Sequence, residues 1–144
     1  MKQTSNPIVL IGAGVGFTPM LSMLETLVSS KHGHQVTYVH CVKNADQHSF
    51  ASHVDKLVED LDHFTSNAFY SQPNEKKLNL NKTKVHHGRL NKNSLDKILS
   101  NPKKSEFYLC GPKEFILTII EVLKKNFLVP EQNISFEYFA PQLQ

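Results

Sequence analysis

The sequence predicts a doubly wound α/β domain, in which a five-stranded parallel sheet carries helices on both faces. Three observations support this fold class. Short apolar runs alternate along the chain with segments of helical periodicity. Most of these runs lack the polar alternation of a strand with one face in water, so we expect both faces to be covered. The 144 residues suit one domain of ordinary size.

Five apolar runs supply the predicted strands. They are residues 8–11, 36–41, 68–70, 107–110 and 134–139. The polar residues 71–84 follow the third run, and we expect them to form a surface loop.

Apolar residues that recur every three or four positions predict the helices between these strands. The periodic segments are residues 21–28, 50–61 and 115–127. A weaker apolar patch at 95–99 predicts a short helix that ends before Pro102, because a proline disfavours helical geometry in the residue before it.

Composition and charge argue against several classes of function. The 16 Lys and Arg exceed the 13 Asp and Glu by only three charges, and the lysines are scattered among acids, so nucleic-acid binding is not expected. No apolar run is long enough for a membrane span or a signal peptide. We therefore expect a cytoplasmic domain that binds neither nucleic acid nor a membrane.

Cysteine and histidine spacing gives no reason to expect a metal site. The two cysteines form no CxxC pair, which argues against structural zinc and iron–sulfur clusters. The eight histidines have no Cys or acid at ligand spacing, and solvated surface side chains are expected for them. His48 is expected to help begin the second helix.

The most informative segment is the glycine-rich turn that follows the first strand. Gly12, Gly14 and Gly16 lead directly into a helix, with Thr18 expected as its N-cap and Pro19 as its first residue. Free N–H groups and the helix dipole make such a turn an anion site, and a pyrophosphate is its usual ligand. The spacing is G-x-G-x-G, which differs from both the dinucleotide fingerprint and the P-loop. A tight turn that binds nothing remains the alternative.

The fourth predicted strand, residues 107–110, also ends in a turn that contains glycine, Cys110-Gly111-Pro112. If it lies beside the first strand, Gly111 and Gly14 line one crevice at the carboxyl ends of the sheet. The sequence offers no base to activate Cys110, so from the residues alone this cysteine is expected to be a small buried apolar group.

Three motifs in order resemble the NAD(P)H-binding domain of ferredoxin-NADP reductase-like flavoenzymes, and most closely the reductase part of flavohemoglobins, the nitric oxide dioxygenases. They are Gly12-Ala-Gly-Val-Gly-Phe-Thr-Pro, Tyr108-Leu-Cys-Gly-Pro and Phe136-Glu-Tyr-Phe-Ala-Pro. The resemblance extends from about Asn6 to Pro141 and implies that residues 1–144 form one NAD(P)H-binding domain, the C-terminal part of a larger flavoenzyme.

The resemblance implies a role for each matching position. The nucleotide-binding residues implied are Gly12, Ala13, Gly14, Val15, Gly16, Phe17, Thr18, Pro19, Gly111 and Pro112. Cys110 lies beside the nicotinamide in the family, and Glu137 is expected to tune electron transfer. The residues that reach the flavin are Tyr138, Phe139, Ala140 and Pro141, and Phe139 is expected to pack on the isoalloxazine ring. Two positions depart from the family, with Phe136 in place of Tyr and Ala140 in place of Gly.

The expected substrate is NADH, with NADPH as the alternative. A 2′-phosphate calls for an arginine in the loops after the second or third strand, and residues 42–44 and 71–73 contain none, although Lys43 could serve as a point charge. FAD would be held by a flavin-binding barrel outside this chain. Heme would belong only to a full-length relative with a globin domain.

The implied function is hydride delivery from NAD(P)H to FAD, which feeds electrons to heme for nitric oxide dioxygenation, with no autonomous turnover by the isolated domain. Two alternatives stay open. One is the reductase component of another oxygenase or electron-transfer chain. The other is a standalone nucleotide-binding module without catalysis, which would need no exposed aromatic at Phe139.

Overall fold

The computed structural model describes residues 4–139, and in this part of the chain six parallel strands form one sheet. The strands are β1 (Ile8–Ala13), β2 (Val36–Val42), β3 (Phe64–Tyr70), β4 (Lys84–His87), β5 (Glu106–Pro112) and β6 (Ile134–Phe139). Their order across the sheet is β4-β3-β2-β1-β5-β6, and every neighbouring pair runs parallel. The sheet is therefore doubly wound, as predicted.

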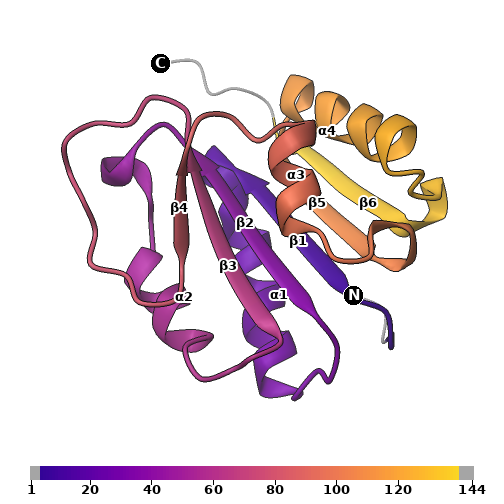
Figure 1. Cartoon of the computed structure of the whole chain (residues 1–144), viewed down its shortest axis with the longest axis horizontal. Helices are drawn as coiled ribbons and strands as arrows, with labels where there is room; N and C mark the ends of the chain where they lie inside the picture. Colours follow the sequence, from indigo (N-terminus) through magenta and orange to yellow (C-terminus); the bar gives the residue numbers. More distant parts are fainter. Residues whose placement is uncertain (1–3, 140–144) are drawn as a thin grey trace.

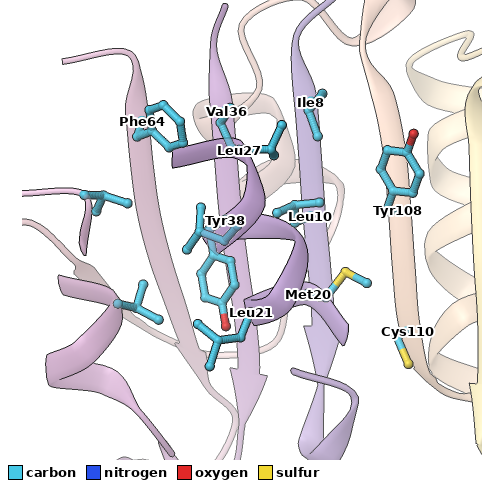
Figure 2. Close-up of a cluster of buried hydrophobic side chains, with 13 residues drawn as sticks. Ile8, Leu10, Met20, Leu21, Leu27, Val36, Tyr38, Phe64, Tyr108 and Cys110 are labelled. Carbon is cyan, nitrogen blue, oxygen red and sulfur yellow. The ribbon is translucent and has the colours of Figure 1, made fainter. Parts of the chain in front are cut away.

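In the described residues, four α-helices connect the strands and cover both faces of the sheet (Figure 1). They are α1 (Phe17–Ser29), α2 (Ala51–Leu57), α3 (Lys92–Ile98) and α4 (Lys113–Asn126). On one face, α1 and α2 bury a cluster that includes Leu10, Tyr38 and Tyr108 (Figure 2). On the other face, α3 and α4 bury Ile11 and Leu109 against their own apolar stripes. Successive strand residues point to opposite faces, which explains why these strands are apolar throughout.

The prediction of five strands was wrong, because β4 is a sixth. This strand has four residues, lies at the edge of the sheet and exposes most of its polar side chains. It is held by backbone pairing with β3 and by His86, whose ring stacks on Phe69 at 4.4 Å between centroids. An edge strand of this kind carries little apolar signal, so hydrophobic patterning assigns its residues to a loop.

The loop between β3 and β4 is fastened to α2 by one buried carboxylate. Asp55 is 4% exposed, and its oxygens accept N–H donors from the backbone of Asn81, Lys82 and Thr83 at 2.7–2.8 Å. Burial raises the pKa of Asp55, but the backbone donors outweigh it and hold this pKa below the usual range. The loop is polar, as predicted, and hydrogen bonds to Asp55 hold its last residues, just before β4, against α2.

None of the helices formed within residues 4–139 has the length and apolar character needed to cross a bilayer.

Candidate functional site

The candidate site lies where the winding of the sheet reverses. β1 and β5 are neighbours, and the chain continues from β1 toward β2 on one side and from β5 toward β6 on the other. In open α/β sheets, ligands bind outside the carboxyl ends of the strands at such a switch point. The sequence left open whether the strand at 107–110 lies beside the first strand, and the pairing of Gly12 with Cys110 shows that it does.

The glycine-rich turn occupies the carboxyl end of β1 as a single turn of 3-10 helix, Gly14–Gly16. Gly14 has a φ of +58°, a region that favours glycine. A Cβ atom at Gly16 would overlap the carbonyl oxygen of Cys110, so glycine is required there for the turn to pack on β5. Val15 projects outward and is 67% exposed. The turn thus packs on β5 at Gly16 and is exposed to solvent at Val15.

The start of α1 differs from the expectation for Thr18 and Pro19. The helix begins at Phe17 with Gly16 as its N-cap, so Thr18 and Pro19 are its second and third residues. Gly16 already has right-handed helical geometry, with a φ of −65° and a ψ of −4°, and Thr18 Oγ1 donates to the carbonyl of Val15 at 3.4 Å instead of capping the helix. No side chain caps the helix. The Phe17 N–H donates to the carbonyl of Val15 and Pro19 has no N–H, so this end of α1 offers an anion its positive dipole rather than a row of free N–H groups.

The end of β5 brings the second glycine turn to the same edge. Cys110 is 6% exposed, Gly111 is buried, and Pro112 precedes α4 as its N-cap. Burial first, and the nearby Glu137 second, raise the pKa of the Cys110 thiol. Cys110 is therefore a buried, neutral thiol. Glu137 lies opposite it in the register of β6 and is exposed.

β6 places one aromatic ring against the glycine turn and two others in solvent. The Phe139 ring contacts the position of Gly16 and lies near that of Gly14, and the side chain is half-buried. Phe136 and Tyr138 are exposed, with ring centroids 5.2 Å apart. The structure therefore joins Phe139 to the turn directly. The predicted residues Ala140 and Pro141 lie outside the described residues.

An open cleft of about 570 Å³ adjoins the turn, within the usual size range of small-molecule sites. Its walls are Ala13 and Gly14, the loops that follow β2, β3 and β4, and the first turns of α4. Two cationic side chains line it, Lys43 and the exposed Arg89, together with Ser71. Arg89 is the single arginine of the sequence. Arg89 lies outside the loops after β2 and β3, because it follows β4, the strand that the sequence did not reveal.

Two histidines are buried beneath the turn, against the expectation of solvated histidines. His40 is 1% exposed, and its Nε2 lies 3.3 Å from the carbonyl oxygen of Gly14. His48 Nδ1 pairs with the Tyr70 hydroxyl at 2.8 Å. Burial first, and for His40 also the neighbouring His48, lower the pKa of each histidine to about 4, so both are neutral near pH 7. The sequence could have indicated a buried position for His40, because this residue lies inside an apolar strand.

These histidines do not form a metal site with other ligands. Within residues 4–139, no three His, Cys, Asp or Glu side chains come together in a group that could hold a metal ion.

The chain is similar to known proteins over most of its length. Residues 10–120 match the family described as "Oxidoreductase NAD-binding domain". The flavohemoprotein of Deinococcus radiodurans is 32% identical over 143 residues, which are 98% of this chain and 34% of that protein. That of Bacillus thuringiensis is 35% identical over 135 residues, 94% of this chain and 33% of that protein. The chain thus spans about a third of the length of these curated relatives.

Solved structures show the same fold. The flavohem-like FAD/NAD-binding domain of nitric oxide dioxygenase from Vibrio cholerae superposes with a TM-score of 0.82 at 28% identity, covering 98% of this chain and 54% of that one. The flavohemoglobin of Malassezia yamatoensis, solved with bound FAD and heme, gives a TM-score of 0.73 at 21% identity, covering 96% and 33%. The resemblance drawn from the sequence motifs is confirmed.

Proposed function

The chain belongs to the oxidoreductase NAD-binding domain family, and from that premise we propose that it binds NADH at the carboxyl edge of its sheet and delivers hydride to FAD held by another domain. That flavin domain, and the heme that receives the electrons in flavohemoglobins, would lie outside residues 1–144. The final step would be nitric oxide dioxygenation.

One observation carries the proposal: the glycine turn, the end of β5 and Phe139 converge on one edge of the sheet. The positive dipole end of α1, with no side chain capping it, suits a pyrophosphate. The turn can accept the backbone approach of a ligand at Gly14, where no side chain stands in the way. The donor chemistry and the adjoining cleft therefore fit a dinucleotide.

The residues of this edge would take separate roles. Gly14, Val15 and Gly16 would bind the pyrophosphate through their backbone, and the turn at Cys110 and Gly111 would carry the nicotinamide. Phe139 lies at the junction of the two and would have to move for a nicotinamide to reach a flavin. The nicotinamide supplies the hydride, so the protein contributes binding and orientation rather than an acid or a base.

The proposal is tested by hydride transfer between separate domains. An FAD-loaded flavin barrel from a flavohemoprotein relative, without its own nucleotide domain, is mixed anaerobically with this chain and NADH, and flavin absorbance is followed. We expect bleaching that depends on the chain and is lost in Gly14→Val. Gly33→Val is the matched control, because a Cβ atom at Gly33 meets nothing within 4 Å. If the wild-type chain accelerates bleaching no more than Gly14→Val does, the proposal fails.

A further inference from the structure

His40 lies directly beneath the glycine turn, on the face of the sheet covered by α1 and α2. It stands opposite Gly12 in the register of β1 and β2, and its ring is 5.0 Å from that of Phe17, the first residue of α1. Its Nε2 reaches the carbonyl oxygen of Gly14 at 3.3 Å. One side chain therefore contacts both the turn and the start of the helix.

The direction of this hydrogen bond is fixed by chemistry. A carbonyl oxygen only accepts, so the neutral His40 ring carries its hydrogen on Nε2 and donates it to Gly14. Nδ1 is then an acceptor, and it is buried without a hydrogen-bond partner among the described residues. A buried unpaired acceptor costs stability that an apolar side chain of similar size would not. Stability of the fold alone therefore does not account for a histidine here.

The hydrogen bond also decides where the next N–H group points. In a planar trans peptide, the C=O of Gly14 and the N–H of Val15 point in opposite directions. Because the carbonyl is directed inward to His40, the Val15 N–H is directed outward, on the side where Val15 is exposed. Glycine at position 14 would otherwise let this peptide rotate easily and present its carbonyl oxygen to an anion.

His40 is itself held by a second layer of side chains. The His48 ring meets it edge-on with 5.3 Å between centroids, and His48 is fixed in turn by the Tyr70 hydroxyl. Tyr70 ends β3, immediately before Ser71 in the wall of the cleft. A chain of contacts thus runs from the Gly14 carbonyl through His40, His48 and Tyr70 to the cleft wall at the end of β3.

We propose that His40 is a positioning residue for the dinucleotide: by holding the Gly14 carbonyl inward, it keeps the Val15 N–H aimed at the pyrophosphate. This inference rests on the proposed nucleotide site and adds to it a side chain that touches no ligand. It requires that affinity for the pyrophosphate depend on a hydrogen-bond donor at the place of His40 Nε2.

Two variants at this position separate binding from folding. Glutamine places an amide N–H where His40 Nε2 stands, whereas leucine fills the space and offers no donor. We expect His40→Leu to raise the Kd for NADH and for ADP-ribose about tenfold, the effect of one lost hydrogen bond. His40→Gln should stay within about threefold of wild type, while His40→Leu keeps or raises the unfolding temperature because its apolar side chain leaves no unpaired acceptor.

Adenosine serves as the probe without a pyrophosphate, and its Kd should be the same in all three proteins. The inference is overturned if His40→Leu binds ADP-ribose as tightly as wild type. It is also overturned if both variants lose affinity for ADP-ribose and adenosine alike, in step with a lower unfolding temperature. Failure of the wild-type chain to bind ADP-ribose at all would instead refute the proposed nucleotide site.

Discussion

The two sides of the switch point are built in different ways. On the side of β1, β5 and β6, the site is made of backbone: a 3-10 turn packs directly on the end of β5, and Gly16 leaves no room for a side chain. On the side of β2, β3 and β4, side chains build the site, through His40, Tyr70 and Arg89. The first side should therefore be sensitive to added volume, and the second to lost donors, acceptors and charges.

The largest effect is expected where the backbone side is tightest. Gly16→Ala places a Cβ atom against the carbonyl of Cys110, so either the turn or β5 must shift. We expect the free energy of unfolding to fall by about 3 kcal/mol, as in other overpacked sites, measured by urea denaturation. Gly33→Ala is the control, because nothing lies within 4 Å of its Cβ position. If the two variants are equally stable, the backbone side of the site is not as tightly packed as we infer.

The next effect is expected on the side built from side chains. Asp55→Asn weakens the acceptor for three backbone N–H groups and should cost about 2 kcal/mol of unfolding free energy. The exposed Asp60→Asn is the control and should cost little. If both variants unfold at the same urea concentration, the loop does not depend on the buried carboxylate.

The side built from side chains should also make the stability of the chain depend on pH. The pKa of Asp55 is lowered in the folded chain, so its stabilising effect is present above the unfolded value of about 3.9 and is lost as the pH falls through the folded value. The pKa values of His40 and His48 are lowered to about 4 from 6.5, so protonation opposes folding as the pH falls from 6.5 toward 4. As the pH falls from 6.5 toward 4, the urea midpoint of the wild-type chain should therefore decline, and that of His40→Leu should decline less. Equal slopes would contradict burial of a neutral His40.

A smaller and more selective effect is expected at the rim of the cleft. Arg89 is exposed and lines the cleft with Lys43, and an arginine there suits a 2′-phosphate. Arg89→Ala should raise the Kd for NADPH about tenfold and leave the Kd for NADH within about twofold. The exposed Lys77→Ala should change neither. Equal losses for both nucleotides would show that Arg89 does not read the 2′-phosphate.

The same division explains what the sequence could predict. Gly12, Gly14 and Gly16 are contiguous and follow an apolar strand, so the backbone side of the site is visible as a motif. The sequence left open whether β1 and β5 are neighbours, and the pairing of Gly12 with Cys110 shows that they are. On this side the start of α1 was misplaced, because Gly16 already has helical geometry and serves as the N-cap.

The side-chain half could not be found in this way, because its partners are far apart in sequence. His40 meets Gly14 only through the register of β1 and β2, and Tyr70 meets His48 across 22 residues. Arg89 reaches the cleft because β4 adds a sixth strand whose pairing, rather than its apolar content, defines it. Such contacts depend on tertiary packing, which periodicity does not encode.

The central claim is that the glycine turn binds the pyrophosphate of the dinucleotide, and backbone amide NMR tests it most directly. On titration of the labelled chain with NADH, we expect saturable shifts of the Val15, Gly16 and Phe17 amide signals, with Gly33 unchanged. ADP-ribose should reproduce these shifts and adenosine should not. Saturation with NADH that leaves the signals of the turn in place would contradict the account.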